Sequence, residues 1–142
     1  SVTGHFREGF SKIAGRFVKT IVMAWGNILS VVVVIFVAHT QVNLQHDPRW
    51  GRNSNSPSED PFLTGSYGFE LVTGTQSPDP IGGQNLMSSQ MKHWTGYAVE
   101  ANRFGFNANF SLHDLAETYM TPLRMMLKAN VSAAMVCYLV FW

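Results

Sequence analysis

The sequence predicts a mainly α-helical membrane protein with an N-terminal interfacial amphipathic helix, one or two transmembrane helices, and a long irregular extramembrane segment with little β structure. Two observations carry this prediction. A basic amphipathic stretch, residues 1–19, leads directly into an uncharged apolar stretch, residues 20–39, and the segment that follows is rich in Ser, Asn, Gly and Pro. Because a helix rises about 1.5 Å per residue and a bilayer core is about 30 Å thick, about twenty uncharged residues are enough for one crossing.

Composition narrows the function classes. Charged residues make up 13% of the chain and the formal net charge is +1, so no broad basic surface for nucleic acid is expected. The single cysteine, Cys137, excludes an internal disulfide and a metal cage built from cysteines.

Residues 1–19 have the pattern of a helix that lies flat at a membrane surface. Phe6, Phe10, Ile13 and Phe17 share one narrow sector of a helical wheel, and cations occupy the rest. The side chains expected to contact lipid headgroups are Arg7, Lys12, Arg16 and Lys19. The positive-inside tendency places this end of the chain on the cytoplasmic, matrix or stromal side. The alternative is an amphipathic helix packed on a soluble partner.

Residues 20–39 are interpreted as a retained transmembrane helix with two unlike faces. Small and polar residues gather on one face, which we expect to contact other helices through Gly26, Asn27 and Ser30. A side-chain amide within the membrane needs a hydrogen-bond partner, so Asn27 is expected to bond to a neighbouring helix.

Residues 40–110 are expected to be mostly irregular, because Pro and Gly turn signals recur along them. One short strand is predicted between Tyr67 and Thr73. The aromatic residues Phe104, Phe106 and Phe110 suggest an extended segment whose aromatic edge contacts a partner.

Helix signals return in residues 111–121, where a short amphipathic helix is predicted. Ser111 is a good N-cap and is followed three positions later by Asp114. Pro122 then restarts or kinks the helix. Residues 122–142 are predicted to form a second transmembrane helix or, alternatively, a membrane-buried or re-entrant one.

Few residues suggest chemistry. His39, at the end of the first span, is a candidate for haem or chlorophyll ligation, although a headgroup contact fits it better. His113, Asp114 and Glu117 stand at helical spacing and could touch one metal ion, but a capped, solvated helix start explains them better, so no metal site is predicted. No nucleophile elbow, phosphate loop or pair of carboxylates is evident, so no catalytic residue is assigned.

These features together predict a non-catalytic accessory subunit that stabilises a multi-subunit respiratory or photosynthetic complex, and hence a role in electron transport or photosynthesis. Its expected partners are lipid and other membrane subunits, with no small-molecule substrate and no nucleic acid, in an inner, plasma or thylakoid-type membrane. One alternative is a self-assembling pore or filament subunit. The other is a pigment- or metal-binding membrane protein that uses His39 or His113.

Overall fold

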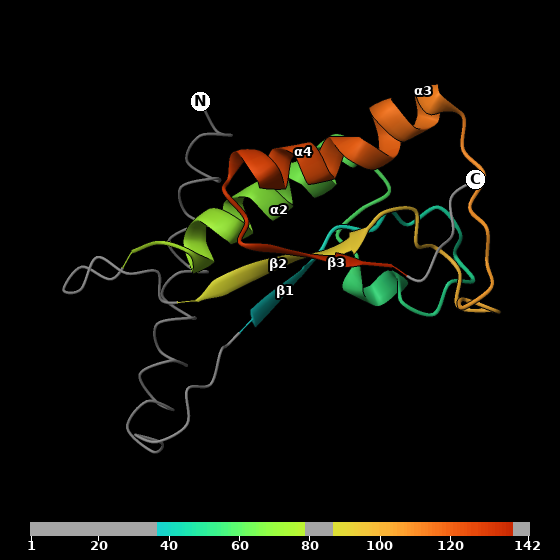
Figure 1. Ribbon diagram of the computed structural model, residues 1–142, viewed down its shortest axis with the longest axis horizontal. Helices are drawn as coiled ribbons and strands as arrows, with labels where there is room; N and C mark the ends of the chain where they lie inside the picture. The colour runs from blue at the N-terminus through green and yellow to red at the C-terminus, as the bar shows by residue number, and fades with distance from the viewer. Residues whose placement is uncertain (1–36, 79–86, 138–142) are drawn as a thin grey trace, which may run out of the picture.

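The computed structural model describes residues 37–78 and 87–137, which form a three-stranded parallel sheet covered on one face by helices (Figure 1). The strands are β1 (Val37–Gln41), β2 (Ser88–Trp94) and β3 (Ala133–Val136), and they lie side by side in the order of the sequence. Helix α2 (Pro61–Thr75) connects β1 to β2, and α4 (Met120–Lys128) connects β2 to β3. The described chain is therefore two consecutive β-α-β units that share β2.

Helix α2 begins where the sequence supplies a cap and a proline. The Asp60 carboxylate accepts a hydrogen bond from the Leu63 backbone N–H at 2.5 Å, and Pro61 occupies the start of the helix. The strand predicted between Tyr67 and Thr73 was wrong, because these residues lie inside α2. Packing against the sheet and α4 overrides the β propensity of this segment.

The second connection is a compound helix. It runs from α3 (Leu112–Asp114) through a π-helical turn, η2 (Leu115–Tyr119), into α4. The Ser111 hydroxyl accepts a hydrogen bond from the Asp114 N–H at 3.0 Å, which confirms the predicted N-cap. Pro122 lies in the first turn of α4, shortly after the π-helical turn.

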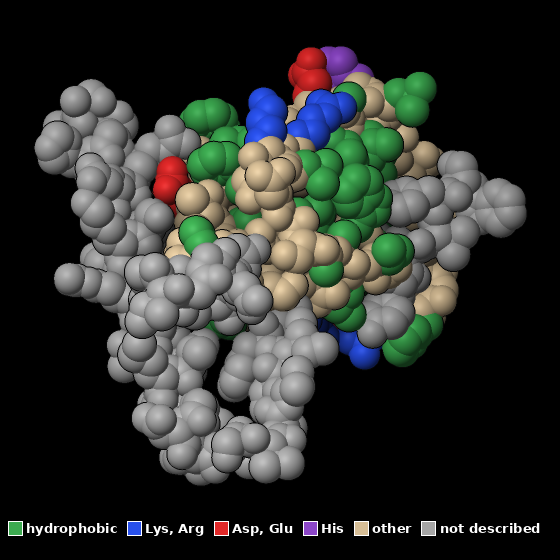
Figure 2. Space-filling view, turned by 60° about the vertical axis from the view of Figure 1, so that its left-hand side comes forward, with side chains coloured by type: hydrophobic (Ala, Val, Ile, Leu, Met, Phe, Trp, Pro, Cys, Tyr) green, Lys and Arg blue, Asp and Glu red, His purple; other side chains and the backbone are tan. Residues whose placement is uncertain are grey.

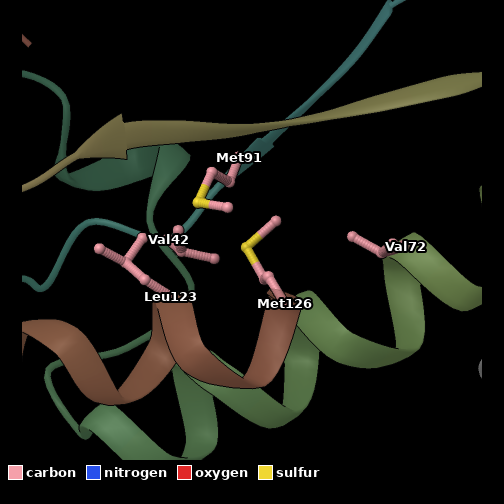
Figure 3. Packing of buried hydrophobic residues seen from close by; sticks show 5 residues of the cluster. All are labelled: Val42, Val72, Met91, Leu123 and Met126. Carbon is pink, nitrogen blue, oxygen red and sulfur yellow. The ribbon is translucent and has the colours of Figure 1, made fainter. Parts of the chain in front are cut away.

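A compact apolar core lies between the sheet and the two helices (Figure 3). It contains Val42, Val72, Met91, Leu123 and Met126, each at most 4% exposed. Met91 points from β2 toward Met126 of α4 (Figure 3). Removing this apolar surface from water is the main favourable contribution to folding.

Two glycines let α2 approach α4 closely. A Cβ atom on Gly68 would lie 2.9 Å from Met126 Cγ and 3.0 Å from Val42 Cγ1. A Cβ atom on Gly65 would meet Pro122 Cα at 3.1 Å and would also collide with the Met125 side chain. Any larger side chain at either position would push the helices apart.

The side chain of Gln76, directly after α2, joins the amino ends of β2 and β3. Its Oε1 accepts the backbone N–H groups of Ser89 and Ser132, both at 3.0 Å. Its Nε2 donates to the Asn130 carbonyl at 2.7 Å. One amide therefore satisfies backbone groups from both crossover units.

A second apolar cluster lies beside the sheet and includes the segment after β3. Its buried members are Trp50, Tyr97, Ala108 and Cys137, and Phe106 and Phe110 pack against them. The short 3₁₀ turn η1 (Asn53–Asn55) follows Trp50.

The predicted fold class, a mainly α membrane protein with little β structure, was wrong. Within residues 37–78 and 87–137 no helix is long and apolar enough to span a membrane. The described part of residues 122–142 contains most of α4 and the strand β3, and α4 buries Leu123 and Met126 while Arg124 and Lys128 are exposed. Figure 2 shows Lys and Arg side chains beside a hydrophobic area on one face of the molecule.

The expected irregular segment, residues 40–110, instead contains α2 and β2. The predicted interfacial helix and most of the first predicted span fall on residues 1–36, outside the described ranges, and residues 37–39 begin β1.

We predict that Gly68→Ala destabilises the chain by about 1–3 kcal/mol, because the new methyl group must displace Met126 and Val42 in a filled core. The matched control is Gly51→Ala, since a Cβ atom at Gly51 meets nothing within 4 Å. Its effect should stay within about 0.5 kcal/mol. Urea unfolding followed by circular dichroism measures both. Equal effects for the two variants would contradict the close helix approach.

Candidate functional site

A small hollow lies where β1 and β2 end. Its lining comes from the segments that follow the two strands, together with one residue of the π-helical turn. The lining residues are Val42, Asn43, Leu44, His93, Thr95, Gly96, Tyr97, Ala98 and Tyr119. Ligands of parallel α/β sheets bind at the carboxyl ends of the strands, so this edge is the place to look for function.

Asn43 and His93 connect the ends of the two strands across the hollow. The His93 backbone N–H donates to Asn43 Oδ1 at 3.2 Å, and Asn43 Nδ2 lies 3.3 Å from His93 Nδ1. Both residues are buried, at 5% and 2% exposure. Buried polar groups are stable only when they are hydrogen-bonded, and each of these two satisfies the other.

Lys92 precedes His93 and lies on the other side of the strand from the core. The residues of β2 alternate between buried and partly buried, and Met91 faces the helices. Because side chains of a strand alternate between faces, Lys92 lies on the face that α2 and α4 leave uncovered. The Lys92–His93 peptide bond is cis, and the ladder with β3 is irregular between Lys92 and Trp94.

Tyr97 packs its ring between two other aromatic side chains. Its ring centroid lies 4.7 Å from that of His93 and 5.5 Å from that of Trp50, both edge-on. Its hydroxyl donates to Glu100 Oε1 at 2.7 Å. Burial and this bond to Glu100 together raise the pKa of Tyr97, which therefore remains a neutral donor at physiological pH.

Glu100 is the carboxylate nearest to this cluster, and its oxygens are occupied. Arg52 forms an ion pair with Oε1, and Arg103 Nη1 lies 3.3 Å from Oε2. Burial alone would raise the pKa of Glu100, but the Tyr97 hydroxyl and the two guanidinium groups outweigh it, so the pKa is lowered. The Arg52 guanidinium also lies 5.7 Å from the centre of the Tyr97 ring.

Tyr119, which lines the hollow, belongs to a group of aromatic rings. The Tyr119 ring stacks on His46, with centroids 5.5 Å apart, and tilts against Phe110 at 4.3 Å. Burial, with a smaller contribution from the charge of Asp114, raises the pKa of the Tyr119 hydroxyl.

The hollow combines the polar side chains of Asn43, His93 and Thr95 with the aromatic rings of Tyr97 and Tyr119. Side chains of these kinds can form hydrogen bonds to the hydroxyl groups of a ligand. The nearby carboxylate of Glu100 is already bound by Arg52 and Arg103. In residues 37–78 and 87–137 no three His, Cys, Asp or Glu side chains come together in a way that would hold a metal ion.

The residues expected to bind lipid or neighbouring helices lie outside the described ranges. These are Arg7, Lys12, Arg16, Lys19, Gly26, Asn27 and Ser30. His39 lies on β1 opposite Gln90, and its role in binding haem or chlorophyll stays a prediction.

The structure describes the remaining predicted site residues, and they are not among those that line the hollow. His113 Nε2 lies 3.4 Å from Glu117 Oε2 on an exposed helical face. Phe106 and Phe110 pack against the chain's own second cluster, whereas Phe104 is 71% exposed. Contact of these three aromatic residues with a partner stays a prediction.

Sequence reasoning missed Asn43, Lys92, His93 and Tyr97. The segment Ser88–Trp94, SSQMKHW, has no regular apolar–polar alternation in its sequence, and the alternation appears only in the burial of its residues. Reading residues 40–110 as irregular hid the strand, and without the strand these residues have no common edge on which to meet.

Comparison with known proteins shows the family of the chain. Residues 38–142 match the family model described as the glycosyl hydrolase family 3 N-terminal domain. The chain is 36% identical to the probable β-D-xylosidase 7 of Arabidopsis thaliana over 106 residues, and 31% identical to β-D-xylosidase 3 of the same plant over 137 residues. These alignments cover 68% and 93% of this chain but only 14% and 18% of the two relatives.

Solved glycosidase structures also match the chain. A family 3 exo-β-xylosidase in complex with a xylobiose aziridine probe matches with a TM-score of 0.66 and 31% identity, over 71% of this chain and 14% of that one. The β-glucosidase 3B of Thermotoga neapolitana in complex with glucose matches with a TM-score of 0.67 and 26% identity, over 74% of this chain and 14% of that one.

These matches overturn the functional predictions made from sequence. The prediction of a non-catalytic membrane scaffold in electron transport or photosynthesis was wrong, because the relatives are β-xylosidases and β-glucosidases, which are enzymes. The predictions of an energy-transducing membrane, of membrane-subunit partners and of no small-molecule substrate were wrong for the same reason. The apolar sequence that suggested a membrane includes the strands and helix faces of a sheet with a buried core. The chain belongs to glycosyl hydrolase family 3 and matches its N-terminal domain.

Proposed function

We propose that this chain forms the sugar-binding edge of a β-glycosidase active site, in which Lys92 and His93 donate hydrogen bonds to the hydroxyl groups of a β-xyloside or β-glucoside. The observation that carries the proposal is the position of His93. It stands at the carboxyl end of the central strand, bonded to Asn43 and packed against Tyr97. The names of the xylosidase and glucosidase relatives support the substrate class.

The described carboxylates favour a binding role over bond cleavage for this part of the chain. Glycoside hydrolysis generally uses two carboxyl groups, one of them an acid with a raised pKa. Glu100 has a lowered pKa and is bound by two arginines and a tyrosine, which is the opposite of what a general acid needs. Asp47 is held by Arg49, whose hydrogen bonds lower the pKa of Asp47 to about 2.

Binding alone is a substantial contribution to catalysis. Donors fixed to a rigid strand hold a pyranose ring in one orientation, so the cleaving groups meet the glycosidic bond without a further search. Lys92 supplies a cation at the end of β2, and His93, the next residue, lines the hollow.

We predict that Lys92→Met and His93→Ala abolish the binding of xylose and glucose to the chain, because each removes a donor at the carboxyl end of β2. The matched controls are Lys128→Met and His113→Ala, which remove the same kinds of side chain from exposed positions on the outer helices. Saturation-transfer NMR with each sugar measures binding, and circular dichroism checks the fold.

Unchanged binding in folded Lys92→Met and His93→Ala proteins would refute the proposed function. An equal loss in the Lys128→Met and His113→Ala controls would also refute it, since the sugar would then not depend on this edge.

We also predict that Glu100→Gln destabilises the chain at neutral pH and has little effect in acid. Because folding lowers the pKa of Glu100, its ionised form stabilises the folded chain above the usual carboxyl value of 4.5. That contribution is lost as the pH falls through the lowered pKa. The difference in Tm between the parent chain and Glu100→Gln should therefore shrink as the pH is lowered.

The control for this measurement is Glu59→Gln, an exposed residue in the turn before α2. A difference in Tm for Glu100→Gln that stays constant at every pH would show that the carboxylate charge does not hold Arg52 and Arg103.

A further inference from the structure

We infer that Asn43 is a positioning residue that holds His93 in the tautomer with its proton on Nε2, so that the ring presents a neutral N–H donor. The sugar-binding part of this inference rests on the proposed function. The tautomer assignment rests on the hydrogen-bond geometry alone.

The orientation of the Asn43 amide follows from the groups that face it. The His93 backbone N–H can only donate, and the Asn43 side-chain atom that faces it at 3.2 Å must therefore be the oxygen. The amide nitrogen is then the atom that lies 3.3 Å from His93 Nδ1.

A second contact supports the same orientation. Asn43 Nδ2 also donates to the Gln41 side-chain oxygen at 3.1 Å. The two hydrogen atoms of the amide nitrogen are thus directed at Gln41 Oε1 and at His93 Nδ1. A flipped amide would direct its oxygen at the Gln41 oxygen and its nitrogen at a backbone donor.

The contact with the amide nitrogen decides which ring nitrogen of His93 carries the proton. An amide N–H directed at Nδ1 makes that nitrogen an acceptor, so a neutral His93 carries its proton on Nε2. A proton on Nδ1 would place two donors 3.3 Å apart in a buried site, where an unpaired donor is costly.

The surroundings keep the ring in this orientation. His93 is 2% exposed, and the edge-on Tyr97 ring packs against it with centroids 4.7 Å apart. His93 also lines the hollow, so the identity of its protonated nitrogen decides whether a sugar hydroxyl there finds a donor or an acceptor.

The direct test is the tautomer of the unmodified chain. Long-range ¹H–¹⁵N NMR of the His93 ring should give a Nδ1 shift typical of an unprotonated nitrogen and a Nε2 shift typical of a protonated one. The opposite pattern overturns the inference without the use of any variant.

Asn43→Asp then tests the cause. An aspartate still accepts the His93 backbone N–H, but its second oxygen can only accept from Nδ1. The proton of the neutral ring should therefore move from Nε2 to Nδ1, and the ¹⁵N shifts of both nitrogens should move accordingly. Asn55→Asp introduces the same charge at an exposed position of the same loop region and should leave the ring unchanged. A Nδ1 shift that does not move in Asn43→Asp overturns the positioning role.

The binding of xylose, measured on the same samples, connects the tautomer to function. Asn43→Asp should weaken binding about tenfold, the effect of one lost hydrogen bond of about 1.4 kcal/mol, and Asn55→Asp should not. Normal sugar binding with the proton on Nδ1 refutes the inference and leaves the proposed function intact. The assigned tautomer without any sugar binding refutes the proposed function and supports the role of Asn43 as the residue that sets the tautomer.

Discussion

The close approach of α2 to α4 is the contact on which the rest of the described structure depends. It needs Gly65 and Gly68, because the neighbouring side chains and the backbone at Pro122 leave no space for a Cβ atom. Where the helices approach this closely, Met126 reaches the core beside Met91 of the central strand. A wider spacing would leave voids between helix and sheet, and voids in close-packed interiors are costly. The position of β2, and with it of His93, follows from this contact.

The functional edge is held by polar contacts that cross between strands. Asn43 belongs to the segment after β1 and His93 to β2, and their two contacts fix the distance between the strand ends. The Tyr97 hydroxyl donates a hydrogen bond to Glu100 and so connects this pair to the Arg52–Glu100–Arg103 group. Fully satisfied polar networks in low-dielectric surroundings are rigid, which is what a binding edge for a small polar ligand requires.

Local signals in the sequence were informative, and long-range ones were not. The cap at Ser111 could be predicted because it depends on residues within one turn, and the structure confirms it. The segment around Tyr67 could not, because its helix is decided by packing on α4 rather than by propensity. The described apolar residues of the second predicted span belong to α4 and β3, because a buried helix face and a short strand also read as apolar sequence.

The site illustrates the same limit. Asn43 and His93 are joined by a hydrogen bond although they lie fifty residues apart in the sequence. Nothing near either residue marks it as a partner of the other, and only the parallel register of β1 with β2 brings the two strand ends to one edge. Sequence reasoning that does not place these strands side by side cannot assemble such a pair.

Gln76 gives the opposite edge a property of its own. Gln76 Oε1 accepts the backbone N–H groups of both Ser89 and Ser132, so one side chain holds the amino ends of β2 and β3 together. Opening of either crossover at this point breaks a hydrogen bond to the same oxygen, so we expect the two β-α-β units to open together in local unfolding. The edge that carries Asn43 and His93 would then open with the whole sheet or stay closed.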